Sequence, residues 1–397
     1  MILSKLMKLL IFETHPIQYR APVYQHLEKL CPGQFEVVYA SDFSVRGYRD
    51  KQFGATFSWD TPLLSGYNSR VLNTERAKGI ESWRGLSGKG VFHFVKKQKP
   101  KAILLHSFSY EFCIAAYFAA KVHDIPIWIR METQDNASPR GAIKATIRSL
   151  VYRMLYKNVS KAFYIGSLNR SHLMKHGVDP SRLRKAHYCT PNTLQGMTAN
   201  AKQQLRSSVR TQHQIPDSHS VITFVGKLIA KKNPELIFRA LKLLPLAHQT
   251  HHVTCLFVGT GELDETLRTL ASDLFQSHGI RTLFAGFVNQ TQLPTYYLAS
   301  DIIILPSRQM GETWGLVVNE GLQSGCAVIV TNTTGCSVDF GPLDRVRVIR
   351  DDDATGLINA IESLQPLPRS FDWASDIMPE YSIEAAAATI CREITQL

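Results

Sequence analysis

The sequence has few features that would place it in a secreted, metal-binding or disulfide-stabilised class. Its seven cysteines are scattered and include no Cys-x-x-Cys pair, which argues against a disulfide framework or a zinc ribbon. Its fourteen histidines show no metal-spaced set, and the group His248, His251 and His252 is expected on a loop surface rather than at a metal. We therefore expect reduced, mostly buried thiols in a cytosolic protein, with neither a metal nor another cofactor.

Membrane-spanning, repeat and nucleic-acid-binding classes are also disfavoured. No apolar run reaches the roughly 18 residues that cross a bilayer. The start of the chain resembles a secretion signal, but Lys5 and Lys8 interrupt its apolar run and no small-residue cleavage site follows. The sequence contains no internal repeat and no low-complexity tract. Because it also contains no nucleic-acid motif or basic–aromatic alternation, nucleic acid is not expected as a partner.

Positive charge is abundant in the chain and unevenly distributed. The whole chain carries 45 Lys+Arg against 33 Asp+Glu, a net charge of +12. Residues 1–200 hold 29 basic and 13 acidic side chains, a balance of +16, whereas residues 201–397 hold 16 and 20, a balance of −4. A basic half suits an anionic acceptor or an anionic membrane surface. We therefore expect the two halves to perform different tasks.

Strand-like and helix-like runs alternate along the whole chain, which is typical of α/β proteins with parallel sheets. Short apolar runs predict strands, and apolar residues at helical spacing predict the helices between them. The predicted strands are 7–13, 35–41, 101–107, 125–132, 161–167, 221–227, 253–259, 281–286, 301–307, 327–331 and 345–350. The predicted helices are 20–30, 113–122, 234–244, 263–275, 292–298, 354–364 and 382–397.

Two stretches interrupt this alternation. Residues 42–84 are rich in glycine, aromatic and turn residues and are long for a plain connection, so we expect a binding loop or flap. Residues 200–220 are polar and have no strong period, so we place a domain junction near them. The predicted division is an N-terminal domain over residues 1–195, closed by the helix 382–397, and a C-terminal domain over residues 196–381.

Residues 138–157 combine apolar and basic side chains in one predicted helix. The apolar set is Ile143, Ile147, Leu150, Val151 and Met154, and the basic set is Arg140, Lys144, Arg148 and Lys157. One interpretation is a basic amphipathic helix that lies on a membrane. The other, which we favour at this point, is a helix that faces the core and has a solvated basic rim.

The most informative stretch is 311–335, GETWGLVVNEGLQSGCAVIVTNTTG, which follows a predicted strand. It carries Glu312 and Glu320 eight positions apart, and residues 315–318 have the pattern of a first helical turn. A helix N-terminus presents unpaired N–H groups and partial positive charge, which suit a diphosphate. Eight helical residues span roughly 12 Å, about the reach from a ribose past two phosphates to a hexose. A carboxylate also accepts two hydroxyl hydrogen bonds at once, as a vicinal diol requires.

A cationic stretch, GKLIAKKNP at 226–234, lies between a predicted strand and a predicted helix. Its Lys227 and Lys232 fall where a phosphate could sit. Fixed cations there would stabilise a departing diphosphate, because negative charge grows on it in the transition state. The alternative interpretation, for these lysines and for the two glutamates, is ordinary solvated surface charge.

Together these stretches resemble the motifs of retaining GT-B glycosyltransferases, the large family numbered four, also called glycosyl transferases group 1. The resemblance covers nearly the whole chain, is strongest from 221 to 335 and is weakest in 40–100. It implies an α/β fold of two Rossmann-like domains whose parallel sheets face each other across a cleft. It also implies transfer of a sugar from a nucleotide diphosphate donor, of UDP or GDP type, to a hydroxyl acceptor with retained anomeric configuration.

The resemblance implies roles for individual residues of the second half. Glu320 would bind the ribose hydroxyls and Glu312 the donor sugar. Lys227 and Lys232 would neutralise the leaving diphosphate, which makes a metal unnecessary. Many relatives have arginine at the position of Lys227, so a looser grip is expected from its single ammonium group. The further donor-binding candidates are Gly261, Val288, Gly311, Gly315, Leu316 and Gly335.

The first half offers candidates for contact with the acceptor or the sugar. Residues 14–19, THPIQY, resemble a subset of relatives that share His-Pro-Ile-Gln-Tyr, which implies contacts from His15 and Gln18; Trp59-Asp60 and Gly66-Tyr67 in the long loop fit the same subset. Arg130 and Glu132 end a predicted strand where relatives often carry histidine, so a polar contact is expected without an imidazole. His106, at the end of the preceding strand, is a weaker candidate. Pro191-Asn192 resembles the family's hinge.

The preferred function is synthesis of a cell-surface polysaccharide or glycolipid, with a glycan or lipid-linked acceptor at the inner membrane face. Two alternatives stay open. One is a nucleotide-sugar epimerase or a sugar phosphorylase on the same architecture. The other is a non-catalytic basic module that binds a glycan or a membrane.

Overall fold

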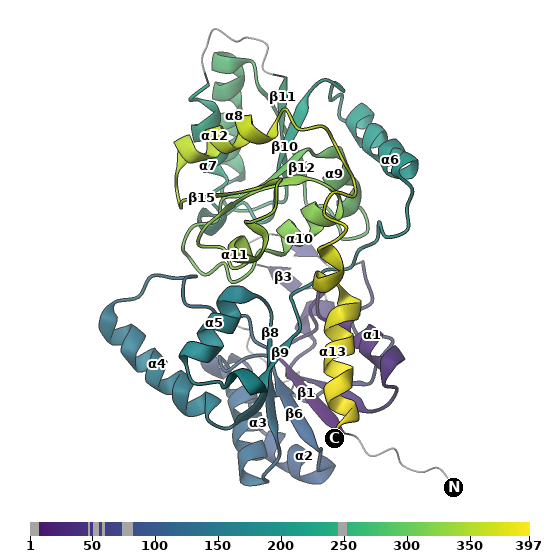
Figure 1. Cartoon of the computed structure of the whole chain (residues 1–397), viewed down its shortest axis with the longest axis vertical. Coiled ribbons are helices and arrows are strands. Elements are labelled where there is room, and N and C mark those ends of the chain that lie inside the picture. Colours follow the sequence, from purple (N-terminus) through teal and green to yellow (C-terminus); the bar gives the residue numbers. More distant parts are fainter. Residues whose placement is uncertain (1–7, 47, 51–54, 58–59, 74–81, 245–251) are drawn as a thin grey trace.

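The computed structural model describes residues 8–46, 48–50, 55–57, 60–73, 82–244 and 252–397, arranged as two lobes stacked one above the other (Figure 1). The lower lobe is built on a seven-stranded parallel sheet of order β5-β2-β1-β6-β7-β8-β9. Its strands are β1 Leu9–Glu13, β2 Phe35–Tyr39, β5 Ser69–Val71, β6 Ala102–Leu105, β7 Ile127–Ile129, β8 Val159–Tyr164 and β9 Leu183–Lys185. Its helices are α1 Ala21–Leu30, α2 Val91–Gln98, α3 Glu111–Val122, α4 Ala142–Tyr156 and α5 Ser167–Lys175.

The upper lobe is built on a six-stranded parallel sheet of order β12-β11-β10-β13-β14-β15. Its strands are β10 Ser220–Val225, β11 Val253–Val258, β12 Arg281–Gly286, β13 Ile302–Leu305, β14 Ala327–Thr331 and β15 Val346–Ile349. Its helices are α6 Ala199–Gln212, α7 Glu235–Leu241, α8 Asp264–His278, α9 Leu293–Ala299, α10 Leu316–Gln323, α11 Ser337–Phe340 and α12 Ala354–Leu364. Two parallel α/β sheets confirm the predicted fold class.

The strand order reverses direction once in each sheet. In the lower sheet this happens between β1 and β6, and in the upper sheet between β10 and β13. Loops leaving the carboxyl ends of strands diverge at such a switch point, which opens a crevice where ligands bind in doubly wound folds. The loops after β1 and β10 are the ones that carry His15, Gln18 and the lysines of the predicted site.

The last helix, α13 Ile383–Thr395, starts at the upper lobe and packs on the lower one (Figure 1). The Ser382 hydroxyl caps it by accepting the Ala385 N–H at 3.1 Å. Its apolar face, which includes Ile390 and Ile394, joins the core cluster of α1 and the lower sheet. The predicted closing helix is therefore present, while the division of the chain at residue 195/196 stays a prediction.

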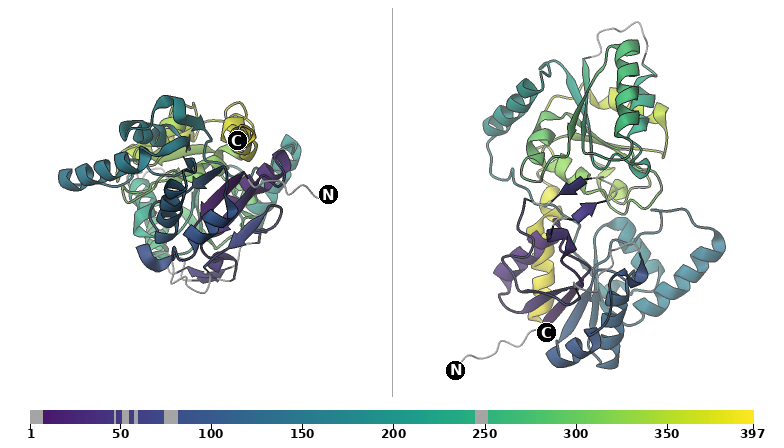
Figure 2. Two further views of the ribbon diagram at one scale, coloured as in Figure 1. Left: turned by 90° about the horizontal axis from the view of Figure 1, so that it is seen from below. Right: turned by 180° about the vertical axis from the view of Figure 1, so that it is seen from behind.

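The long segment predicted as a binding loop contains a small antiparallel hairpin, β3 Tyr48–Asp50 and β4 Ala55–Phe57. Figure 2 shows this hairpin from behind, between the two lobes. Just after it, the Asp60 carboxylate accepts hydrogen bonds from the Thr291 N–H at 3.2 Å and the Thr291 hydroxyl at 2.5 Å. The segment thus bridges the lobes through Asp60, whereas its neighbour Trp59 lies outside the described residues, as do His248 and His251.

The polar stretch 200–220, near which we placed a domain junction, is largely a helix, α6. Two of its arginines, Arg206 and Arg210, are buried and both bind the Asp301 carboxylate, at 2.7 Å and 2.6 Å. They also donate to carbonyls at the end of α9, including that of Ala299. An apolar periodicity could not reveal this helix, because charged hydrogen bonds hold it on the upper lobe.

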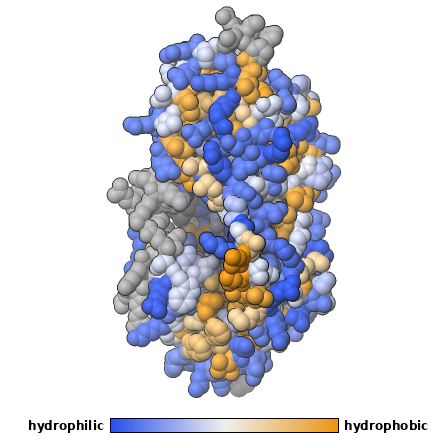
Figure 3. All heavy atoms as spheres, turned by 90° about the vertical axis from the view of Figure 1, so that its left-hand side faces the viewer, coloured by the Kyte–Doolittle hydropathy of each residue, from blue (hydrophilic) through white to orange (hydrophobic). Residues whose placement is uncertain are grey.

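The interpretation of α4 as a core-facing helix is wrong. Its apolar residues Ile143 and Leu150 are 78% and 63% exposed, and of the helix only Leu155 and Tyr156 are buried. Figure 1 shows α4 projecting from the lower lobe, and Figure 3 shows hydrophobic residues gathered on that side of the molecule. Among the described residues, no helix is long and apolar enough to cross a membrane.

The arginine pair on Asp301 makes a direct prediction about stability. The change Asp301→Ala leaves two buried guanidinium groups without their shared counter-charge, so we expect a loss of about 3–5 kcal/mol of unfolding free energy. The control is Arg350→Ala, which removes an exposed ion pair with Asp353 and should change the free energy by less than about 0.5 kcal/mol. Urea unfolding followed by fluorescence measures both, and equal midpoints for the two variants would contradict this account of α6.

Candidate active site

A cavity of about 590 Å³ lies between the carboxyl ends of the two sheets. It is lined by the loop after β1, by Glu132 beyond β7, by the loops after β10, β11 and β12, and by the start of α10. The predicted site residues that line it are His15, Gln18, Glu132, Lys227, Lys232, Val288, Glu312, Gly315, Leu316 and Glu320. The cavity therefore brings together residues that the sequence separates by about 300 positions, from both halves of the chain.

The helix α10 begins at the cavity wall. Gly315 precedes it with φ +100°, and a Cβ there would lie 2.6 Å from the Leu305 side chain. Both facts require glycine, since L-residues avoid this backbone region. No side chain of the described residues caps this helix start, so its first-turn N–H groups are available to a ligand, and Leu316 and Val317 line the cavity. Glu312 lies in the loop before α10. Of the eight-residue interval from Glu312 to Glu320, which was predicted as helix, only the part from Leu316 is helical.

The lysine loop lies opposite this helix start. Lys227, Lys231 and Lys232 all line the cavity, the last two within a short 3₁₀ turn, Ala230–Lys232. Asn233 then takes the left-handed conformation with φ +49°, which asparagine tolerates better than most residues. It is fully buried and accepts a hydrogen bond from Arg308 at 2.9 Å. The asparagine therefore ends the turn in a conformation that glycine also adopts readily.

Lys231 was not among the predicted site residues. Its ammonium group donates to the Gly311 carbonyl at 3.0 Å, and burial lowers its pKa below the ordinary value. Its neighbour Lys232 forms an ion pair with the Glu312 carboxylate. Burial alone would raise the pKa of Glu312, but Lys232 and Lys231 outweigh it and hold this pKa below its ordinary value. Glu312 is therefore ionised beside the two lysines.

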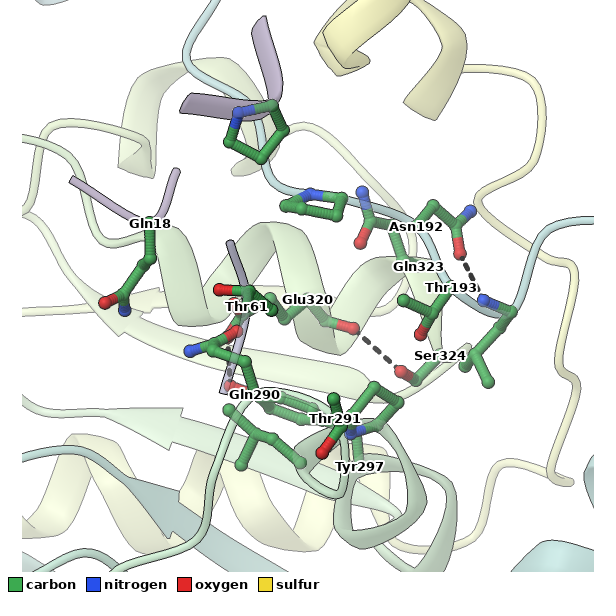
Figure 4. A pocket seen from close by; sticks show the side chains of 15 residues that line it. Gln18, Thr61, Asn192, Thr193, Gln290, Thr291, Tyr297, Glu320, Gln323 and Ser324 are labelled. Atoms are coloured by element: carbon green, nitrogen blue, oxygen red, sulfur yellow. Dashed lines mark hydrogen bonds between the residues drawn. The ribbon is translucent and has the colours of Figure 1, made fainter. Parts of the chain in front are cut away.

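Glu320, on α10, is in a different electrostatic setting. Its carboxylate accepts a hydrogen bond from the Tyr297 hydroxyl at 2.6 Å, and burial raises its pKa to about 7. It also lines a smaller adjoining cavity of about 100 Å³. Figure 4 shows Glu320 in this cavity, with Gln18 and Thr61 of the lower lobe on one side and Asn192 on the other.

Glu132 is held firmly at the lower edge of the main cavity. Arg20 pairs with it at 2.5 Å, the Tyr188 hydroxyl donates to it, and the Thr313 hydroxyl donates to it across the lobes at 3.2 Å. Arg20 also pairs at 2.6 Å with Glu13, a fully buried carboxyl. Burial raises the pKa of Glu13, although Arg20 opposes this. The sequence analysis missed these supporting residues because Arg20 and Glu132 are 112 positions apart.

Two predicted contact residues of the lower lobe do not line the cavity. Arg130 is buried and donates to the carbonyls of Ala186 at 3.3 Å and His187 at 3.0 Å. His106 is buried with its Nε2 3.1 Å from the Tyr24 hydroxyl. Neither residue belongs to the lining of this cavity, and their assignment as sugar or acceptor contacts stays a prediction. His15, by contrast, lines the cavity, and burial lowers its pKa to about 4.

Three predicted donor-binding glycines, Gly261, Gly311 and Gly335, also stand outside the lining. A Cβ at Gly261 would lie 2.4 Å from the Leu228 carbonyl oxygen, and one at Gly335 would lie 1.8 Å from the Thr313 carbonyl oxygen. Gly311 donates its N–H to the Ala137 carbonyl at 2.6 Å and has φ +97°. Gly261 and Gly335 therefore need glycine for close backbone packing, and Gly311 for its positive φ. Their contact with a donor stays a prediction.

Comparison with known proteins finds similarity in the upper lobe. Residues 206–370 match the family described as Glycosyl transferases group 1. The chain is 30% identical over 121 residues to an uncharacterized glycosyltransferase of Methanocaldococcus jannaschii, covering 30% of this chain and 29% of that protein. It is 31% identical over 210 residues to D-inositol 3-phosphate glycosyltransferase of Mycobacteroides abscessus, covering 51% of this chain and 40% of that protein. These matches thus span less than half the length of the two relatives.

The solved structures extend the likeness to both lobes. Anabaena HepE in complex with UDP matches with a TM-score of 0.72 over 98% of this chain and 100% of that chain, at 14% sequence identity. At this identity the match shows the fold, which is the two-lobed GT-B arrangement predicted from the sequence.

The raised pKa of Glu320 predicts how stability depends on pH. In the unfolded chain this carboxyl ionises near 4.5 and in the folded chain near 7. The native state therefore holds the proton longer, and stability falls as the pH rises from about 4.5 to 7, by up to about 3 kcal/mol from this group. We expect Glu320→Gln to raise the melting temperature at pH 8 and to leave it unchanged near pH 4.5.

The control for this prediction is Glu362→Gln, an exposed glutamate on α12, which should change the melting temperature at neither pH. Calorimetric scans of the three proteins at both pH values provide the measurement. A Glu320→Gln effect of equal size at pH 4.5 and pH 8 would show that the burial argument for this carboxyl is wrong.

Proposed function

We propose that this chain, whose residues 206–370 belong to the glycosyl transferases group 1 family, transfers a sugar from a nucleoside diphosphate sugar to a hydroxyl acceptor. One observation carries the proposal. Three lysines, an uncapped helix start and two carboxylates with different electrostatic settings line one cavity between the lobes. Such a cavity fits a ligand with a dianionic centre flanked by two groups rich in hydroxyls.

The main task of this site would be to stabilise the negative charge on the leaving diphosphate. Breaking the bond between sugar and diphosphate places additional negative charge on the diphosphate oxygens. Lys227, Lys231 and Lys232, together with the N–H groups at the start of α10, would stabilise that charge more in the transition state than in the bound donor. Because these groups are held by packing before the donor binds, little reorganisation is needed when the charge develops.

The two glutamates would hold the ends of the donor. Glu320, buried beside Tyr297, would accept the hydroxyl pair of a ribose, and the nearby Val288 region would lie along the base. Glu312, ionised by Lys232, would accept hydroxyls of the sugar. Lys232 pairs with Glu312 where the sugar would join the diphosphate. Its ammonium group would therefore lie beside the bond that breaks.

Retention of configuration is proposed through attack of the acceptor on the face that the leaving group vacates. A two-step route would need a carboxylate free to form a covalent bond with the sugar. Glu132, the carboxylate contributed to the cavity by the lower lobe, is engaged by Arg20, Tyr188 and Thr313. This engagement disfavours Glu132 as a nucleophile and suits it to accept a hydroxyl of the sugar or the acceptor.

The donor is best identified by its effect on stability, since a ligand that binds only the folded state raises the melting temperature. We propose a uridine or guanosine diphosphate sugar, and the complex of HepE with UDP supports testing uridine first. A thermal-shift series with UDP-, GDP- and ADP-sugars should single out one base. If no nucleotide raises the melting temperature while turnover is also absent, the chain is a binding module instead.

Substitutions of the two glutamates should affect different properties, nucleotide affinity for Glu320 and turnover for Glu312. Glu320→Ala should weaken binding of the bare nucleoside diphosphate about tenfold or more, because a charged acceptor of two hydrogen bonds is lost. Glu312→Ala should leave that binding nearly unchanged and lower kcat roughly 100-fold, because its contacts serve the reacting sugar. Titration calorimetry and steady-state kinetics measure the two effects, with Glu362→Ala as the exposed control.

Equal loss of nucleotide affinity in both glutamate variants would contradict the assignment of Glu320 to the ribose and of Glu312 to the sugar.

Product analysis separates the remaining alternatives on this architecture. An epimerase converts the nucleotide sugar without an acceptor, and a phosphorylase releases a sugar phosphate only when phosphate is supplied. Turnover that requires a hydroxyl acceptor supports the transferase.

For the acceptor we propose a glycan or lipid-linked molecule at an anionic membrane, on which α4 docks. The exposed apolar residues Ile143, Ile147, Leu150 and Met154 recur along one side of the helix, and Lys144, Arg153 and Lys157 are exposed beside them. An apolar stripe with a basic border fits the interface of an anionic bilayer. Arg148 does not belong to this border, because it pairs with Asp135 at 2.6 Å.

Vesicle binding tests this docking surface. The double variant Ile147→Ser with Leu150→Ser should bind vesicles of phosphatidylglycerol and phosphatidylethanolamine about tenfold less than the unchanged protein. The matched control is Phe275→Ser, an exposed apolar residue of α8 in the upper lobe, which should not affect binding. Unchanged vesicle binding, or a dimer in light scattering that the double variant dissociates, would overturn the membrane proposal.

A further inference from the structure

Outside the cavity, two histidines and an aspartate form a buried cluster between α4 and α5. His172 on α5 and His176 at the C-cap of this helix lie one turn apart and are 1% and 2% exposed. Asp135, from the segment after β7, faces both rings: its Oδ1 is 2.9 Å from His172 Nδ1 and its Oδ2 is 3.4 Å from His176 Nε2. The sequence analysis found no metal-spaced histidines, and this His-x-x-x-His pair corrects it.

The hydrogen-bond partners of the two imidazole rings indicate which ring nitrogens are available to a metal ion. The outer nitrogen of each ring meets a hydroxyl of α4: His172 Nε2 is 3.0 Å from Tyr156 Oη, and His176 Nδ1 is 3.2 Å from Ser149 Oγ. If the outer nitrogens carry the ring protons, the inner nitrogens present lone pairs to a carboxylate. The inner Nε2 of His176 is buried and has no hydrogen-bond partner among the described residues.

We propose that Asp135, His172 and His176 bind a zinc-type divalent transition-metal ion. The three inward ligand atoms lie within 4.8 Å of one another. Tetrahedral zinc with bonds of about 2.05 Å has ligand atoms about 3.3 Å apart, so a modest contraction of this triangle brings all three to bonding distance. Two imidazoles and one carboxylate are a ligand set that zinc accepts, with the fourth position left to water.

The surroundings of the cluster match those of a built metal site. Histidine ligands in proteins donate their outer N–H to a fixed acceptor, which orients the ring, and here Tyr156 and Ser149 hold these places. Arg148 binds Oδ1 of Asp135 at 2.6 Å, which leaves Oδ2 to coordinate. Lys175, 3.2 Å from Oδ2, competes with the ion, but its side chain is 66% exposed and can turn away into water.

The site would fasten the segment that reaches the main cavity. Next to Asp135, the Gln134 amide donates to the carbonyls of Glu312 and Thr333, each at 3.4 Å. Further along, the Ala137 carbonyl accepts the Gly311 N–H at 2.6 Å. An ion held by α5 and Asp135 would therefore tie the lower lobe to the loop that carries Glu312. This inference is independent of the proposed sugar transfer.

Metal binding to the full-length protein tests the proposal. After chelator treatment and dialysis, calorimetric titration with Zn²⁺ should show one strong equivalent, and Co²⁺ should give the intense visible absorption of a tetrahedral ion. His176→Gln should abolish both signals, whereas His123→Gln, an exposed histidine after α3, should leave them unchanged. Equal Zn²⁺ binding in the His176→Gln variant would assign the ion to surface histidines and overturn the proposal.

A second variant keeps the test independent of folding defects, because it changes an exposed side chain. Lys175→Ala removes the ammonium group that competes for Oδ2, so Zn²⁺ should bind about fivefold more tightly than to the unchanged protein. Zn²⁺ should also slow amide hydrogen exchange in residues 133–137. An affinity that Lys175→Ala leaves unchanged or weakens would overturn the site.

Discussion

The ion pair between Lys232 and Glu312 joins the two loops on which the candidate site depends. It connects the turn after β10 to the loop before α10, and Lys231 adds a second tie through the Gly311 carbonyl. Lys227 lines the same cavity, as does the start of α10. Ammonium groups beside the N-terminus of a helix suit an anionic group. This side of the cavity is therefore suited to a ligand that carries negative charge.

The rest of the molecule positions this charged wall. The two parallel sheets direct their carboxyl ends toward one another, and α13 returns to the lower lobe and joins its core. Several polar contacts cross between the lobes near the cavity, among them Thr313 with Glu132, Gln134 with the Glu312 carbonyl, and Thr291 with Asp60. Two of these three involve a carboxylate. Such contacts can break and reform at modest cost, which suits a cleft that must admit and release its ligand.

Much of the fold could be predicted from local pattern, and the reasons for the exceptions are physical. Apolar periodicity gave the helix at Ala354–Leu364 with its true bounds. It failed for α6, where Arg206 and Arg210 replace an apolar face. It gave the helix α4 but not the direction of its apolar stripe, which points to solvent. Pattern shows that a face is apolar, but only the structure shows whether that face is covered.

The residues of the candidate site also differ in whether a local pattern could reveal them. The sequence revealed the glutamates Glu312 and Glu320 and the lysines Lys227 and Lys232, because each pair lies in one short motif. Their supporting residues could not be found this way, because Tyr297, Arg20 and Tyr188 come from distant positions. Glycines such as Gly335 were read as ligand contacts although backbone packing already explains them. The histidine pair was overlooked because its third member, Asp135, lies on another segment.

The central claim is that the lysine loop and the start of α10 bind the diphosphate of a nucleotide sugar. A crystal structure of the protein with a nucleoside diphosphate tests it most directly. The account predicts phosphate oxygens within hydrogen-bonding distance of the Lys231 or Lys232 ammonium group and of the N–H groups at Leu316 and Val317, with the ribose on Glu320. A nucleotide bound elsewhere, or one whose phosphates point away from these lysines, would contradict it.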